Sequence, residues 1–384
     1  MSVHISIKIL CLKYNFYMKL TQLKLTNYRN CTDLKIDFDK SKILIIGKNA
    51  QGKTNILESI YFLSGLKSPR TSNNTELINF GSEYFKIEAE VIKSNTNIDL
   101  YYVYNTEKKR EVKVNRVKST IKDFKSVLKT VLFSTSDLLL LRGTPQDRRN
   151  WLDRAISQIY PAYDDRLSKY DKIRIQKNNF LKDCAKTGQT NFALLDVYNE
   201  QLSITGSNII YVRKKFLKEI EKIASEKHRT ISDTERLTIK YDCPFSDNEN
   251  IEDIQKAFLA ELEERKIEEM RRCQACVGPH RDDIIFYINN QESTKFASQG
   301  QQRTIVLALK LSELDIITQK TGDEPILLLD DVLAELDDIR QNYLLKSINI
   351  NTQTIITSVD TILFEDDFLK DVQIFKIDSG KICK

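Results

Sequence analysis

A glycine-rich octapeptide constrains the fold of this chain more than any other feature. It reads Gly47-Lys48-Asn49-Ala50-Gln51-Gly52-Lys53-Thr54 and matches the phosphate-binding pattern of glycine, four residues and then Gly-Lys-Ser/Thr. An apolar run at 43–46 precedes it, and apolar residues with helical spacing follow it at 54–63. A strand, a loop and a helix in this order form the context in which the pattern binds phosphate. The sequence therefore predicts an α/β nucleotide-binding domain.

The residue types of this loop suit ATP and Mg²⁺. Backbone N–H groups of residues 49–54 are expected to surround the phosphates, and the following helix adds the positive end of its dipole. Gly47 and Gly52 allow the backbone to approach a phosphate more closely than a residue with a β-carbon. We expect Lys53 to contact the terminal phosphates during catalysis and the Thr54 hydroxyl to bind Mg²⁺.

A second acidic motif supplies the remaining metal ligand. Residues 326–329 form an apolar run that ends in Asp330 and Asp331, which is typical of a buried strand that delivers carboxylates to a nucleotide site. We expect Asp330 to bind Mg²⁺ together with Thr54, and Asp331 to orient or deprotonate the attacking water. Taken alone, the segment fits an ordinary strand and polar turn equally well.

A third motif lies between these two. Ser298 precedes a helical pattern that begins near Gln301, and Gly300 lies between them. A serine in this position caps a helix and leaves N–H groups facing outward, which predicts a second anion site, separate from the first. A simple capped helix is the alternative.

Composition and periodicity outline the rest of the chain. Lys and Arg number 59 against 54 Asp and Glu, a net charge of +5, and the seven cysteines suit a reducing cytoplasm. No uninterrupted apolar run reaches about 18 residues, so no membrane partner is expected. Residues 1–17 are interpreted as a dispensable extension, and 18–147 as the strand-rich first part of an ATPase. Helical spacing from 148, broken near 187–190, predicts an arm over 148–272, and residues 273–384 complete the ATPase.

The most basic segment lies near residues 108–129. Lys113, Arg116 and Lys118 are our candidates for phosphate contacts with DNA, although a solvated face explains such a run equally well. Three arginines at the foot of the arm are second candidates: Arg142, Arg148 and Arg149.

Along the chain, the P-loop comes first, then a helical insertion, then the Ser298 motif and last the acids Asp330 and Asp331. This arrangement resembles the ABC-type ATPases of the SMC group. The arm is too short for the very long coiled coil of a full SMC protein. The resemblance implies an α/β fold: an ABC-type ATPase head, with a mixed-sheet P-loop core and an antiparallel subdomain, plus an inserted helical arm domain.

The resemblance also implies a site shared between two copies in a head-to-tail dimer. Lys53 and Thr54 of one copy would hold ATP and Mg²⁺, while Ser298, Gly300 and Gln301 of the other would close over the γ-phosphate. The loop 335–337 would lie at this interface. Arg29 and Asn30, after the first strand, match positions on the adenine side in this family.

The function implied by the resemblance is an ATP-dependent DNA-binding clamp. Such a clamp would bind gapped or junction DNA as an ATP-bound homodimer, recruit recombination mediators, and act in repair, replication restart and the SOS response near the nucleoid. Many relatives carry Glu where Asp331 stands and a switch histidine where Ser358 stands, so a weak, DNA-stimulated ATPase is expected. Two alternatives stay open at this point: an energy-coupling ATPase subunit of a transporter, and a nucleotide-sensing module that does not hydrolyse ATP.

Overall fold

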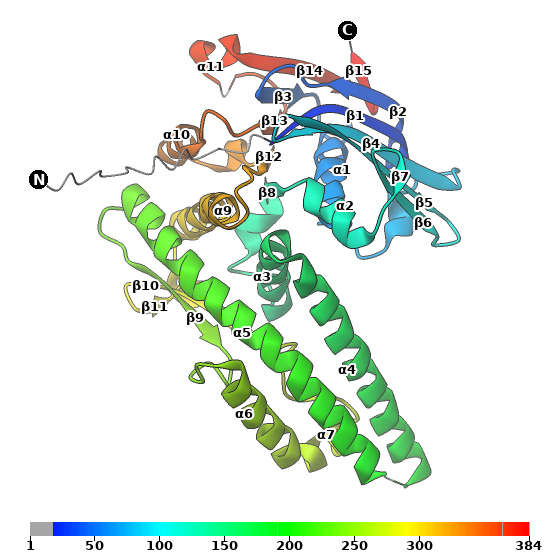
Figure 1. Cartoon of the computed structure of the whole chain (residues 1–384). Coiled ribbons are helices and arrows are strands. Elements are labelled where there is room, and N and C mark those ends of the chain that lie inside the picture. The colour runs from blue at the N-terminus through cyan, green and yellow to red at the C-terminus, as the bar shows by residue number, and fades with distance from the viewer. Residues whose placement is uncertain (1–17, 190, 363, 384) are drawn as a thin grey trace, which may run out of the picture.

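The computed structural model describes residues 18–189, 191–362 and 364–383, and the expected extension at 1–17 lies outside these ranges. Figure 1 shows a head built on two six-stranded sheets, from which a bundle of helices projects as an arm. No helix within the described ranges is both long and apolar enough to cross a membrane.

The first six-stranded sheet carries the nucleotide motifs. Its order is β15-β14-β3-β13-β12-β8, with parallel pairing throughout except at the β14–β15 hairpin. The strands are β3 (Lys42–Ile46), β8 (Thr130–Ser134), β12 (Ile326–Asp330), β13 (Thr354–Ser358), β14 (Val372–Asp378) and β15 (Lys381–Cys383). Because β3 and β12 both pair with β13, the segments after their carboxyl ends lie at one edge of the sheet.

The second six-stranded sheet is antiparallel, with the order β2-β1-β4-β5-β6-β7. Its strands are β1 (Met18–Tyr28), β2 (Cys31–Asp37), β4 (Tyr84–Lys93), β5 (Thr96–Asn105), β6 (Arg110–Val114) and β7 (Val117–Lys118). The short helices η1 (Asn74–Leu77) and α2 (Ile121–Val127) accompany it. The mixed core sheet and the antiparallel subdomain confirm the predicted head.

Two hydrophobic cores cover opposite faces of the mixed sheet. In β3, Ile43 and Ile45 pack into a core shared with the antiparallel sheet and α1 (Lys53–Gly65), while Leu44 packs into the core of the arm side. Residues of β8 and β12 alternate in the same way. A strand that is buried on both faces reads as a continuous apolar run, which explains the apolar segments before Gly47 and Asp330.

The arm contains the two longest helices of the described chain, α4 (Pro161–Thr187) and α5 (Phe192–Ile231). Its other helices are α3 (Pro145–Ile159), α6 (Ile251–Glu264) and α7 (Lys266–Arg272). The predicted break near 187–190 is confirmed, since α4 ends at Thr187 and its C-cap Gly188 is left-handed. Residues 251–272 form two helices, because the chain turns at Arg265, which caps α6 and precedes α7.

A three-stranded sheet, β11-β10-β9, lies beside the root of the arm. It comprises β9 (Leu237–Asp242), β10 (Asp283–Ile288) and β11 (Gln291–Glu292), and α8 (Ser293–Phe296) and α9 (Gln299–Thr321) follow. The remaining elements are η2 (Thr135–Leu139), η3 (Leu333–Glu335), α10 (Asp338–Ser347) and α11 (Asp366–Lys370). The antiparallel pairing of β9 with β10 joins residues 237–242 to residues 283–288.

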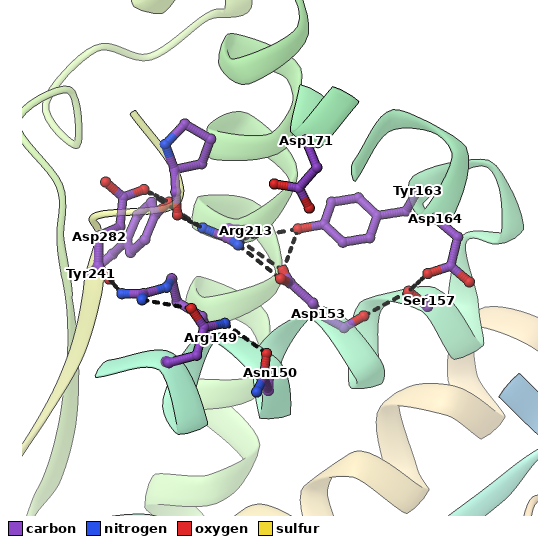
Figure 2. A network of polar contacts seen from close by, with 12 residues as sticks. Arg149, Asn150, Asp153, Ser157, Tyr163, Asp164, Asp171, Arg213, Tyr241 and Asp282 are labelled. Carbon is purple, nitrogen blue, oxygen red and sulfur yellow. Dashed lines mark hydrogen bonds and ion pairs between the residues drawn. The ribbon is translucent and has the colours of Figure 1, made fainter. Parts of the chain in front are cut away.

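A buried polar hub, centred on Arg213 of α5, fixes the root of the arm (Figure 2). Its guanidinium donates to both oxygens of Asp153 on α3, at 2.9 and 2.8 Å, and to the Pro279 carbonyl at 2.6 Å. The Tyr163 hydroxyl on α4 donates to Asp153 at 2.6 Å, and Asp282 lies 3.8 Å from Arg213. The hub therefore connects three arm helices with the segment that leads into β10.

The same region corrects the second set of DNA candidates. Arg148 is buried and donates to both oxygens of Asp283, at 2.7 and 2.8 Å, and Arg149 is buried and donates to the Asp282 carbonyl. Both arginines bind the start of β10 and the residue before it, and are not free to bind DNA. Arg142 is exposed and donates to Gln302 on α9 at 2.8 Å.

Candidate ATP-binding site

The predicted P-loop connects β3 to α1 and turns through left-handed residues. Ala50 has φ 64° and Gly52 has φ 110°, so Gly52 uses a backbone conformation that glycine adopts without strain. Because α1 begins at Lys53, its first N–H groups lie at the loop and have no partner within the helix. The loop therefore presents backbone donors and a helix N-terminus to a phosphate.

Lys53 lies within the loop and not on the surface. Its side chain is 3% exposed, and its ammonium group donates to the carbonyls of Gly47 at 2.6 Å and Lys48 at 3.4 Å. Asp331 lies 3.9 Å away. These neighbours hold the cation at the centre of the loop, where a triphosphate would meet it.

The residues behind the loop explain why both glycines are required. A β-carbon on Gly47 would lie 2.4 Å from the Ile377 carbonyl of β14, and one on Gly52 would lie 2.7 Å from the Asn30 amide oxygen. Asn30 also donates to the Gln51 carbonyl at 3.2 Å and accepts from Asn55 at 2.8 Å. The loop thus packs against β14 and against the segment after β1.

The β14–β15 turn supports the loop from another side. Gly380 donates its N–H to the Gln51 carbonyl at 2.8 Å, and Ser379 donates its N–H to the Gln51 side chain at 2.6 Å. The sequence motifs gave no indication of this support, because these residues are more than 300 positions away from the loop.

The two acids after β12 take up different positions. Asp330 accepts from the Thr54 hydroxyl and from the Thr357 hydroxyl, each at 2.9 Å. Burial raises the pKa of Asp330, and the two hydroxyl hydrogen bonds offset part of that rise. Asp331 has φ 52°, and its side chain is about one-third exposed, at 34%. Asp330 and Thr54 therefore meet, as expected of two ligands of one metal ion.

Thr357 of β13 is a site residue that the sequence motifs did not reveal. Its hydroxyl accepts the Asp331 N–H at 2.9 Å while it donates to Asp330. One threonine thus fixes both acids. The only sequence signal for it would have been its place at the end of a strand parallel to β12.

Arg29 lies at the first turns of α1 and does not project freely toward a base. It donates to both oxygens of Glu58, at 3.0 and 2.8 Å, and to the Glu76 carbonyl at 3.0 Å. Glu58 is almost fully buried and also accepts from Ser68 at 2.5 Å. Contact of Arg29 or Asn30 with adenine stays a prediction, and the structure shows these residues bracing the loop and α1.

Ser298 caps α9 as predicted. Its hydroxyl accepts the Gln301 N–H at 3.2 Å, while the Gln301 side chain accepts the Ser298 N–H at 2.8 Å. Gly300 packs against Arg340 of α10. Across the described chain, no hydrogen bond or ion pair joins Ser298, Gly300 or Gln301 to residues 47–54. The N-terminus of α9 therefore has no direct polar contact with the P-loop of the same copy.

The basic candidates Lys113, Arg116 and Lys118 gather on the β6–β7 hairpin at the edge of the antiparallel sheet. Lys113 and Lys118 are paired across the hairpin, and Arg116 lies in its turn with a side chain that is 91% exposed. Lys113 also lies 4.8 Å from the centre of the Tyr101 ring. Farther along the basic segment, Lys125 pairs with Asp164 and Lys129 is buried, so neither belongs to this exposed edge.

Known protein families share this arrangement of motifs. A model of the RecF/RecN/SMC N-terminal domain family matches residues 19–382. The DNA replication and repair protein RecF of Bacillus subtilis strain 168 is 40% identical over 374 residues, which cover 96% of this chain and all of that protein. The chain belongs to the RecF family.

Other relatives agree with this assignment. RecF of Staphylococcus carnosus is 40% identical over 375 residues, which cover 96% of this chain and all of that protein. A solved structure of the recombination mediator protein RecF with ATP in the RecFOR pathway superimposes with a TM-score of 0.87 at 34% identity, covering 96% of this chain and 98% of that one. An SMC head bound to a winged-helix domain of ScpA shares the fold alone, with a TM-score of 0.53 at 15% identity over 95% of this chain and 96% of that one.

Proposed function

We propose that this RecF-family ATPase is an ATP-dependent DNA clamp. Two copies close on gapped or junction DNA when ATP is bound, and slow hydrolysis of ATP releases them. The observation that carries the proposal is that one copy has two candidate phosphate-binding surfaces with no direct polar contact between them. One is the P-loop, with Lys53 and Asp330, and the other is the N-terminus of α9, with Ser298. A second copy placed head to tail would bring one surface of each type together.

The P-loop surface fits ATP and Mg²⁺. The buried Lys53 ammonium would meet the terminal phosphates, and the adjacent oxygens of Thr54 and Asp330 would hold the metal ion. When bound, Mg²⁺ neutralises phosphate charge and orients the terminal phosphate. Asp331, held through its backbone by Thr357, would position the attacking water and accept its proton. Ser298 and Gly300 of the second copy would donate to the γ-phosphate and exclude bulk water.

The partners follow from the basic hairpin and from the relatives. Exposed cations at a sheet edge bind phosphates of DNA without reading the sequence. The RecFOR pathway named for the RecF–ATP structure leads us to propose RecO and RecR as mediator partners. A protein with these partners would act in the cytoplasm, at the nucleoid.

ATP turnover with and without gapped duplex DNA tests the proposal. We expect DNA to stimulate hydrolysis by the wild-type protein, and Lys53→Ala and Asp331→Asn to abolish the stimulated rate. A turnover rate that DNA leaves unchanged would contradict the clamp. Retained ATP binding without any turnover would instead favour the nucleotide-sensing module.

Charge reversal on the β6–β7 hairpin should weaken DNA binding. For Lys113→Glu, Arg116→Glu and Lys118→Glu combined, we expect at least about a tenfold loss of affinity at low salt. The salt slope should fall by about 0.9 for each DNA phosphate that the variant no longer neutralises. Fluorescence anisotropy of a labelled gapped duplex at several salt concentrations measures both quantities in the presence of ATP.

Single substitutions at the two edges of the same sheet give a matched control. Arg116→Glu lies in the β6–β7 turn, whereas Lys35→Glu lies on β2 at the opposite edge, where Lys35 is also exposed. We expect only Arg116→Glu to lower the affinity. Equal effects would show that net charge, and not the hairpin, determines binding.

A further inference from the structure

The first turn of α9 is attached to the arm through Glu235. The Gln301 side chain donates from Nε2 to Glu235 Oε1 at 2.7 Å. The same side chain accepts the Ser298 N–H at 2.8 Å and so closes the capping box of α9. One glutamine therefore connects the residue that caps the anion site with a carboxylate outside α9.

Glu235 belongs to the turn between α5 and β9 and faces the end of α5. His228 Nε2 lies 3.7 Å from Glu235 Oε2, and both atoms are buried without a hydrogen-bond partner in the described chain. Burial lowers the pKa of His228, and the hydrogen bond that the Glu235 carboxylate makes in the described chain is the one to Gln301. The Glu235 side chain is partly buried, at 19% exposed, and its Oε2 atom is already unsatisfied, so its one hydrogen bond to Gln301 is costly to lose.

The first turn of α9 is also held by the segment that follows β12. Arg340 of α10 donates from Nε to the Thr304 hydroxyl at 2.8 Å, and its Nη2 atom lies 3.2 Å from the place of a β-carbon on Gly300. Arg303 pairs with Glu335 at 3.0 Å. The first turn of α9 is thus braced between α10 and the Glu235 turn.

The helix that ends at this point spans the arm. α5 has 40 residues and runs from the α4–α5 connection at the arm tip to the side of α9 (Figure 1). At 1.5 Å per residue, it is about 60 Å long. A continuous helix of this length can transmit a displacement of the tip to the turn that carries Glu235.

We propose that Glu235 is a positioning residue of the composite ATP site. It couples the arm helix α5 to the α9 turn that closes over the nucleotide of a second copy. The inference rests on the proposed clamp, because Ser298 acts only across a dimer. Glu235 itself touches neither ATP nor the P-loop, so its loss affects dimer closure and turnover but not nucleotide binding by a single copy.

The test compares Glu235→Ala with Asp233→Ala, an exposed carboxylate in the same turn. Three quantities are measured on the full chain: affinity of dilute protein for a fluorescent ATP analogue, ATP-dependent dimerisation by sedimentation velocity, and kcat with KM for ATP. For Glu235→Ala we expect nucleotide affinity within about twofold of wild type, but dimer affinity and kcat about tenfold lower, the size expected when one charge-assisted hydrogen bond is removed. Asp233→Ala should match the wild type in all three.

Glu235→Gln keeps an acceptor for Gln301 without the charge and should lose only about threefold in dimer affinity and kcat. It also carries the test if Glu235→Ala does not fold, as judged by its urea midpoint. If both Glu235 variants dimerise and hydrolyse ATP like Asp233→Ala, the role of Glu235 is overturned while the proposed clamp is not. A wild-type protein that stays monomeric at saturating ATP would instead overturn the clamp, and the assignment with it.

Discussion

Asp331→Asn should stop hydrolysis while leaving ATP bound. The asparagine has the same shape but is a far weaker proton acceptor than the carboxylate, and loss of a general base lowers turnover by about 100-fold to 10,000-fold. The backbone N–H of residue 331 would still donate to Thr357, and the hydrogen bond between Thr54 and Asp330 would stay in place. We therefore expect a nucleotide affinity close to that of wild type and a longer lifetime of the ATP-bound dimer on DNA.

Single-turnover hydrolysis and equilibrium binding of a fluorescent ATP analogue measure the two effects separately. Asp371→Asn, which changes an exposed carboxylate in the turn before β14, provides the control and should leave both unchanged. Turnover at the wild-type rate in Asp331→Asn would show that Asp331 is a structural acid and that another group activates water.

Arg213→Met should cause the largest loss of stability. It removes the centre of the hub and leaves Asp153 and the buried Asp282 without their cation (Figure 2). Removing one partner of a buried ion pair costs about 3–5 kcal/mol, because the remaining charge stays desolvated. We expect the free energy of unfolding in urea to fall by about this amount.

Two further variants show whether the cause is the unpaired charge. Arg229→Met, at an exposed position of the same helix, should change the free energy of unfolding by less than about 0.5 kcal/mol. Adding Asp153→Leu to Arg213→Met should restore part of the loss, because the orphaned carboxylate is removed. A loss in Arg213→Met no larger than in Arg229→Met would contradict the role of the hub.

The head of the fold and the centre of the site could be predicted from local patterns. The glycine spacing of residues 47–54, and their place between a strand and a helix, indicate a phosphate-binding loop. The acids after residue 329 are indicated by the fully apolar strand that precedes them. Ser298 and Gln301 form a capping box within four residues of chain. In each case neighbouring residues determine the local conformation, so the pattern is visible in the sequence.

The remaining features depend on contacts between distant segments. Thr357 fixes both acids only because β13 lies beside β12, and Gly380 supports the loop across more than 300 residues. Arg148 looked like an exposed cation at the foot of the arm until Asp283, 135 residues later, was placed opposite to it. Charge alone does not indicate whether an arginine faces solvent or a buried carboxylate.

In the proposed clamp, ATP is enclosed between the P-loop of one copy and the α9 terminus of another. Mixing two inactive variants, Lys53→Ala and Ser298→Arg, tests it directly through the rate of DNA-stimulated ATP hydrolysis. Half of the dimers in an equal mixture would be mixed, and each would have one intact site, so about one quarter of the wild-type rate should return. A mixture no more active than the two variants measured separately would contradict a shared site.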